Sequence, residues 1–323
     1  MQDQFRRQIN YLRISITDRC NLRCKYCMPS EGVAWMPHEN ILSYEEILRI
    51  MRISTQLGFH RFRITGGEPL VRKGILEFLG KGAQIPGVDD LMLTTNGLLL
   101  PEMAFGLKAA GVQRVNISLD TMNPERFAEI TRGGDVSKVI QGIFRSLEAG
   151  LNPVKVNVVV VRDFNTQELP GFLTLAKQYP IHIRFIELMP IGTSSERRSD
   201  FVSIQEMKEL LGVKQYIPTK EVPGGGPAEY FRPDDYKGSI GFISALSRHF
   251  CNTCNRIRLT PDGKLRPCLH NEREIDLLEG LRNGSSDQEL LDIFAQAVWY
   301  KPAEHRMNEE ALQGHRIMSQ IGG

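Results

Sequence analysis

The sequence lacks any long hydrophobic run. Its 323 residues contain no stretch of about 18 apolar residues, so the sequence predicts no transmembrane helix. The first ten residues carry Arg6 and Arg7 but no apolar segment after them, which is unlike a signal peptide. We therefore expect a cytoplasmic protein.

The sequence also lacks an excess of charge of one sign. Its formal net charge is +2, too small to favour nucleic acid or an anionic membrane as the main partner. No basic, aromatic-rich stripe occurs, which argues against a nucleic-acid-binding module. Any anion-binding site must therefore concentrate basic residues locally.

The sequence has no cysteine outside two groups of three. The six cysteines are Cys20, Cys24, Cys27, Cys251, Cys254 and Cys268. In a reducing compartment such groups indicate metal sites rather than disulfides.

The first 190 residues alternate between strand and helix patterns. The predicted strands are Tyr11–Thr17, Arg61–Thr65, Asp90–Thr95, Gln113–Asp120, Val154–Val161 and Ile181–Glu187. The predicted helices are Tyr44–Leu57, Val71–Lys81, Pro101–Ala110, Val136–Ala149 and Thr166–Gln178. Such βα repetition predicts a parallel sheet, either open or closed into a barrel.

Several predicted strands have polar residues at every second position. The polar faces comprise Arg13, Ser15 and Thr17, then Arg63 and Thr65, then Asn116, Ser118 and Asp120, then Lys155 and Asn157. Since successive strand residues point to opposite faces, one face packs on helices and the other lines something polar. Exposed edge strands are the alternative, but six strands cannot all be edges.

We therefore predict an α/β fold in two parts. Residues 1–190 form an incomplete (βα)6 barrel of the TIM type with a polar interior. Residues 191–323 form an α+β extension that closes the open side and carries the second cysteine group. Within it we expect helices at Ser203–Leu211, Glu274–Arg282 and Asp287–Tyr300, short strands between Ser239 and Cys268, and a polar tail.

The first cysteine group has the spacing C-x3-C-x2-C and follows the first predicted strand. Three thiolates can hold an iron–sulfur cubane and leave one iron free for a ligand that is not protein. A zinc site or ordinary buried cysteines are the alternatives, although structural zinc sites usually need four ligands.

With Tyr26 directly before its third cysteine, this motif resembles the signature of the radical S-adenosylmethionine (SAM) superfamily. The resemblance implies a 4Fe–4S cluster on Cys20, Cys24 and Cys27 whose open iron binds SAM. It also implies SAM contacts by Tyr26, Gly67, Glu68, Ser118 and Met189, where Gly67 and Glu68 belong to a Gly-Gly-Glu-Pro segment. Without the cysteines that segment would indicate only a helix-entry turn.

The second cysteine group has the spacing C-x2-C-x13-C and is flanked by His249 and His270. The spacing fits either zinc with a histidine ligand or an iron–sulfur cluster with an open iron. The run C-x2-C-N-R-x-R, followed by the third cysteine, resembles the GTP 3′,8-cyclase (MoaA) family of molybdenum cofactor biosynthesis. The resemblance implies a second 4Fe–4S cluster on Cys251, Cys254 and Cys268.

The same resemblance implies a GTP site and catalytic residues. The implied GTP contacts are Arg13, Arg63, Thr94, Lys155, Arg256, Ile257 and Arg258. The implied catalytic residues are Arg256 and Arg258 together with Gly322 and Gly323 of a C-terminal tail that reaches into the active site. Arg256 and Arg258 are two apart on a predicted strand, so they point the same way.

The implied activity is that of a radical SAM lyase. It cyclises GTP to (8S)-3′,8-cyclo-7,8-dihydroguanosine 5′-triphosphate, with a reductant such as flavodoxin or ferredoxin and cyclic pyranopterin monophosphate synthase (MoaC) as the next enzyme. The chain would be a monomer or homodimer. The alternatives are a two-cluster radical SAM peptide maturase, which usually has more C-terminal cysteines, and a zinc-binding nucleic-acid module, which the low net charge disfavours.

Overall fold

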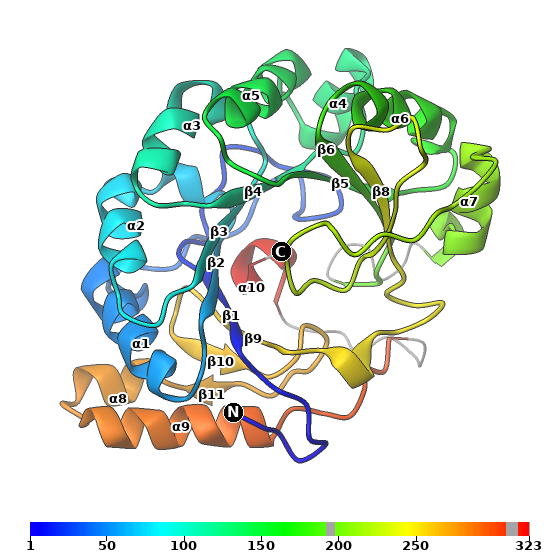
Figure 1. Cartoon of the computed structure of the whole chain (residues 1–323). Helices are drawn as coiled ribbons and strands as arrows, with labels where there is room; N and C mark the ends of the chain where they lie inside the picture. Colours follow the sequence, from blue (N-terminus) through cyan, green and yellow to red (C-terminus); the bar gives the residue numbers. More distant parts are fainter. Residues whose placement is uncertain (192–197, 308–315, 323) are drawn as a thin grey trace.

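The computed structural model describes residues 1–191, 198–307 and 316–322. Its centre is a curved sheet whose first six strands follow one another in the chain and pair in parallel (Figure 1). They are β1 Tyr11–Ser15, β2 Arg61–Thr65, β3 Asp90–Thr95, β4 Arg114–Ser118, β5 Val154–Val160 and β6 Ile181–Glu187. This confirms the predicted incomplete barrel.

Strands from the C-terminal part extend both ends of this sheet. β9 (Arg256–Leu259) pairs in parallel with β1, and β8 (Ser239–Ile243) pairs in parallel with β6. Antiparallel strands follow outside them: β10 Lys264–Arg266 and β11 Ile275–Asp276 beyond β9, and β7 Glu229–Phe231 beyond β8. One 11-stranded sheet thus joins the two parts of the described chain.

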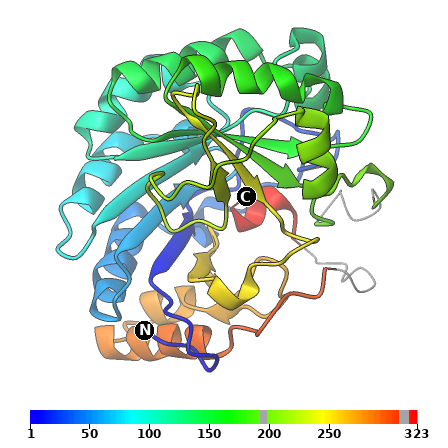
Figure 2. The same cartoon turned by 45° about the vertical axis from the view of Figure 1, so that its right-hand side comes forward.

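Helices cover the outer face of the sheet (Figures 1 and 2). They are α1 Tyr44–Gln56, α2 Ile75–Ala83, α3 Leu100–Ala109, α4 Pro124–Thr131, α5 Val136–Glu148, α6 Leu169–Gln178 and α7 Ile204–Leu211. α8 (Leu278–Arg282) and α9 (Asp287–Trp299) lie beside β10 and β11. α10 (Met318–Ile321) lies inside the barrel, where Figure 1 draws it in red.

Short 3-10 helices interrupt several connections. They are His38–Asn40, Pro69–Val71, Thr166–Glu168, Arg198–Asp200 and Cys251–Thr253.

None of the described helices combines the length and the apolar character that crossing a bilayer requires.

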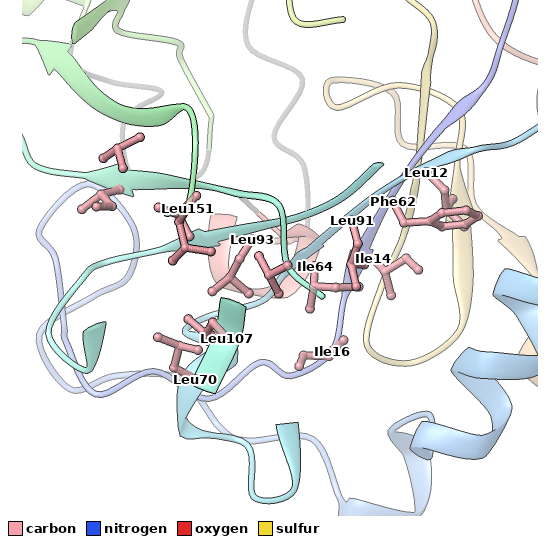
Figure 3. Packing of buried hydrophobic residues seen from close by; sticks show 14 of the residues in the cluster. Leu12, Ile14, Ile16, Phe62, Ile64, Leu70, Leu91, Leu93, Leu107 and Leu151 are labelled. Atoms are coloured by element: carbon pink, nitrogen blue, oxygen red, sulfur yellow. The ribbon is translucent and has the colours of Figure 1, made fainter. Parts of the chain in front are cut away.

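The hydrophobic core lies between the sheet and its outer helices. Leu12, Ile14 and Ile64 are 0% exposed, and Figure 3 shows Leu12 beside Phe62 and Ile64 between Ile14 and Leu93. These strand residues alternate with the polar positions of the inner face, as the sequence predicts. The barrel interior is thereby left to polar side chains.

Three elements differ from the sequence-based expectation. The helix predicted at Glu274–Arg282 is wrong in its first half, because Ile275 and Asp276 pair with β10 and the helix begins only at Leu278. The helix predicted from Val71 begins at Ile75, after Gly74 with a left-handed φ of +79°. α4 was not predicted, although Asn123 caps it and Pro124 opens it.

Candidate active site

A cavity of about 290 Å³ opens inside the barrel. Its wall brings together residues far apart in sequence: the first cysteine group, arginines from the strands, and part of α10. The cavity volume is close to that of a small ligand-binding site. Six of the ten predicted polar strand residues line this cavity, namely Arg13, Arg63, Thr65, Ser118, Asp120 and Asn157.

Backbone hydrogen bonds between the chain segments of β1 and β2 continue beyond the ends of these strands, up to the first cysteine group. The amide of Gly67 donates to Thr17 O at 2.8 Å, and the amide of Glu68 donates to Arg19 O at 2.8 Å. A Cβ on Gly67 would lie 2.4 Å from Arg19 O. Gly67 therefore has a structural reason to be glycine, besides lining the cavity.

Glu68 is enclosed rather than open to the cavity. Its side chain accepts hydrogen bonds from Thr95 Oγ1 at 2.8 Å and from the amides of Asn96 at 2.7 Å and Leu70 at 3.1 Å. The residue is 1% exposed, and burial raises the pKa of its carboxyl to about 7. In this structure Glu68 ties the end of β3 to the loop that approaches the cysteines.

All three cysteines of the first group line the cavity. The amides of Cys27 and Met28 both donate to Cys24 O, which closes a turn, and the amide of Leu22 donates to Cys20 Sγ at 3.3 Å. Burial and the neighbouring Cys20 raise the pKa of Cys27 to about 12, and burial also raises the pKa of Cys24. These thiols must lose their protons when they bind a metal.

Tyr26 and Asp120 form a hydrogen-bonded pair on the wall near these thiols. Tyr26 OH donates to Asp120 Oδ2 at 2.7 Å, and the Val159 amide donates to Oδ1 at 2.8 Å. Burial raises the pKa of Asp120 to about 6. Ser118 and Met189 line the same cavity. Asp120 falls on a predicted polar strand face but was not among the predicted site residues.

Strand register places three arginines side by side. Arg13 of β1 lies opposite Arg63 of β2 on one side and opposite Arg258 of β9 on the other. All three line the cavity, together with Arg256. Burial, and then the charges of Arg258 and Arg63, lower the pKa of Arg13. Adjacent like charges destabilise the free protein, so an anion in the cavity relieves their repulsion.

Arg184 was not among the site residues predicted from the sequence. This residue of β6 is 4% exposed, lines the cavity and lies opposite Asn157 of β5. Its Nε, like those of Arg63 and Arg256, is buried and donates to no atom of the described residues. In its strand Arg184 shares a face with His182, and this period-two polar signal was available in the sequence.

The other predicted GTP contacts occupy different positions. Thr94 lines the cavity and lies 3.5 Å from Arg63 Nη1. Lys155 is 5% exposed, donates from Nζ to Pro223 O, and is not among the lining residues. Ile257 is 0% exposed and lies between Arg256 and Arg258 on the opposite, outer phase of β9.

The second cysteine group lies beside the cavity at the start of β9 and after β10. Cys251 and Cys254 are joined by a turn, in which the Cys254 amide donates to Cys251 O at 3.2 Å. Phe250 and Leu269, each next to a cysteine of this group, line the cavity, whereas the cysteines do not.

The thiols of this group differ electrostatically from those of the first. Burial alone would raise the pKa of Cys254, but Arg256 and Lys301 outweigh it and lower the pKa to about 6. Burial raises the pKa of Cys251, and the nearby Cys268 and Cys254 add to that effect. The three sulfurs are therefore neighbours in a positively charged environment.

The C-terminal tail contacts both the first cysteine group and the arginines of the cavity wall. Met318 and Ser319 of α10 line the cavity, and the Ser319 backbone hydrogen-bonds to Cys27. Gly322 O accepts from Arg258 Nη1 at 2.6 Å. Gly323, also selected from the sequence, lies outside the described residues.

Across the described ranges, no three His, Cys, Asp or Glu side chains converge on one point as a single metal ion would need. A cubane cluster does not require such convergence, because each thiolate binds its own iron.

Comparisons with known proteins agree with this architecture. The Radical SAM superfamily model matches residues 14–176, and the Molybdenum Cofactor Synthesis C model matches residues 181–307. The chain is 51% identical to the GTP 3′,8-cyclase of Pelotomaculum thermopropionicum and 52% identical to that of Moorella thermoacetica, each over 100% of both chains.

Among solved structures, SuiB of Streptococcus suis bound to SAM shares the fold, with a TM-score of 0.58 and 15% identity over 88% of this chain and 68% of SuiB. The family match rests on the curated relatives, whose full length the chain covers. The chain therefore belongs to the GTP 3′,8-cyclase family, the radical SAM cyclases of molybdenum cofactor synthesis.

Proposed function

We propose that this chain joins C3′ of the GTP ribose to C8 of guanine inside the barrel, giving (8S)-3′,8-cyclo-7,8-dihydroguanosine 5′-triphosphate. One observation carries the proposal: a single cavity is lined both by the first cysteine group and by arginines from β1, β2, β6 and β9. A radical source and a polyanionic substrate have to meet in such a place.

The family's cofactors are 4Fe–4S clusters and SAM. The described residues fit them. Cys20, Cys24 and Cys27 would hold one cluster, and Cys251, Cys254 and Cys268 would hold the other, since the thiols of each triplet lie close together. When bound, the first cluster and SAM supply the 5′-deoxyadenosyl radical that takes hydrogen from C3′.

Residues near the first triplet would bind and orient SAM. Tyr26, Gly67, Ser118 and Met189 line the cavity there. Glu68 does not line the cavity, and its carboxylate already accepts hydrogen bonds from Thr95, Asn96 and Leu70. It would therefore act indirectly, by fixing the Gly-Gly-Glu-Pro backbone.

The arginines would bind and orient GTP. Arg13, Arg63, Arg184, Arg256 and Arg258 present guanidinium groups to one cavity. Guanidinium forks suit phosphate oxygens and purine edges. The buried, unsatisfied Nε donors of Arg63, Arg184 and Arg256 support an anionic ligand at this place.

Residues 1–190 would carry the SAM half of the site and residues 191–323 the second cluster and the tail. A low-potential reductant such as flavodoxin or ferredoxin would deliver electrons, and cyclic pyranopterin monophosphate synthase would take the product onward.

A combined iron and SAM assay tests the proposal. Anaerobically reconstituted protein should bind about eight irons per chain, as two cubanes require. With dithionite as the reductant, GTP should accelerate the formation of 5′-deoxyadenosine, whereas ATP should not. About four irons, or SAM cleavage indifferent to GTP, contradicts the proposal, and a peptide maturase would give the second result.

Lys155 should make GTP binding depend on pH. Burial, and then neighbouring charges beginning with Arg184, lower the pKa of Lys155 to about 6, so the free chain holds it neutral at pH 8. A triphosphate bound by Arg184 and Arg63, whose charges lower this pKa, would offset their effect, favour the ammonium form and raise the pKa of Lys155. Binding at pH 8 should therefore take up a proton, and the affinity should fall as the pH rises.

Titration calorimetry of GTP in two buffers with different ionisation enthalpies measures the uptake. Lys155→Met should abolish this component of proton uptake, and Lys73→Met, at an exposed position of the described chain, should retain it. Equal proton uptake in both variants would refute the assignment of Lys155.

A further inference from the structure

Lys301 is a buried cation directly beside the second cysteine group. It follows α9 and is 2% exposed. Its Nζ donates to Arg256 O at 2.8 Å and to Pro267 O at 2.9 Å. Pro267 precedes Cys268, and Arg256 lies two residues after Cys254, so both acceptors belong to segments that carry cysteines of this group.

The third partner of this ammonium is a sulfur. The Lys301 side chain hydrogen-bonds to Cys254, and its charge also acts on Cys251. The partners that the described residues give to Nζ are thus two carbonyl oxygens and a cysteine sulfur. A buried ammonium is costly without a counter-charge. In this environment the negative charge has to come from the cysteines and from what they bind.

The segment that carries Lys301 is fixed independently. Arg7 is 8% exposed and donates to Pro302 O at 2.6 Å, to Ala303 O at 2.9 Å and to Cys251 O at 2.7 Å. Its Nε also pairs with Asp3 at 2.6 Å. Lys301 therefore has a tethered backbone on one side and three acceptors on the other, which leaves its charge little freedom to move away from the sulfurs.

The geometry points to Lys301 as a positioning residue of the second cluster, which donates a hydrogen bond to a ligand sulfur and makes that cluster easier to reduce. This inference rests on the proposed assignment of a 4Fe–4S cluster to Cys251, Cys254 and Cys268. Hydrogen bonds to sulfur and nearby charge are the means by which proteins set cluster potentials. A fixed positive charge favours the reduced state, which carries one more negative charge.

The test uses the full chain in the background Cys20→Ala, Cys24→Ala and Cys27→Ala, so that any cluster present is the second one. Lys301→Gln keeps a donor for the two carbonyls but removes the charge. Lys301→Arg keeps the charge and serves as the matched control. After anaerobic reconstitution, iron is counted, and the reduced fraction is followed by electron paramagnetic resonance at a series of fixed potentials.

Lys301→Gln should lower the ratio of reduced to oxidised cluster at least tenfold at a fixed potential, which corresponds to about 59 mV for one electron. Lys301→Arg should stay within about threefold of the parent. Failure of Lys301→Gln to take up iron, with full uptake by Lys301→Arg, also supports the inference.

Two results count against the inference, and they differ. Equal potentials in all three proteins at about four irons per chain overturn the role of Lys301 and leave the cluster assignment standing. Absence of iron from the Lys301 parent itself overturns the proposed assignment on which the inference rests.

Discussion

Cys24→Ala should reduce SAM cleavage to the background of the assay and halve the iron content. Cys24 lies between Cys20 and Cys27 in the turn behind β1, and all three thiols line the cavity. Two thiolates cannot hold a cubane and still present an open iron to SAM. The measurements are iron per chain and 5′-deoxyadenosine formed with dithionite, in the presence and absence of GTP.

Cys254→Ala is the matched control, since it removes the corresponding residue of the other triplet. It should also lose about four irons, but it should retain cleavage of SAM under strong reduction while making no cyclised nucleotide. If the two variants lose the same activities in the same proportion, the division of labour between the triplets is wrong.

Gly322→Ala should lower the rate of GTP cyclisation about a hundredfold, the order expected when reacting groups are displaced by about 1 Å. Gly322 has a left-handed φ of +71°, and a Cβ there would lie 2.7 Å from Thr65 Cγ2 and 2.9 Å from Ser15 Cβ. Ser15 and Thr65 belong to paired strands, so the tail has to move. The movement breaks the hydrogen bond from Arg258 to Gly322 O.

The rate of product formation and the susceptibility of the C-terminus to carboxypeptidase check this expectation together, since a displaced tail should be both inactive and accessible. Gly80→Ala is the control: a Cβ at this position of α2 meets nothing within 4 Å. A Gly322→Ala protein with the parent's rate but a carboxypeptidase-accessible C-terminus would show that the tail has no part in the reaction.

The sequence predicted the inward faces of the barrel because a strand has only two faces. Arg13 and Arg63 fell on the polar phase of their strands, and the structure places both on the cavity wall. That Arg258 joins their row could not be predicted, because it depends on the register between β9 and β1. Strand pairing between distant segments leaves no local pattern.

The wrong helix prediction at 274–282 and the unpredicted α10 also depend on contacts between distant segments. Ile275 and Asp276 fit a helical pattern, but Leu265 lies opposite Ile275, and Lys264 forms an ion pair with Asp276. Tertiary pairing thus overrode local propensity. The polar tail gave no indication of α10, because its burial inside the barrel depends on surfaces that other segments supply. The resemblance to a family predicted the tail's entry, which residue patterns alone could not.

The partnership of β1 with β9 has a consequence for how the protein is made. A ribosome synthesising about 5–20 residues per second needs on the order of tens of seconds between Tyr11 and its partner Arg256. Throughout that interval one side of the first strand has amide and carbonyl groups without their final partner, in a nascent chain that cannot yet complete its sheet. Biogenesis of this protein should therefore respond to chaperones that shield unpaired strands until the last third of the polypeptide arrives.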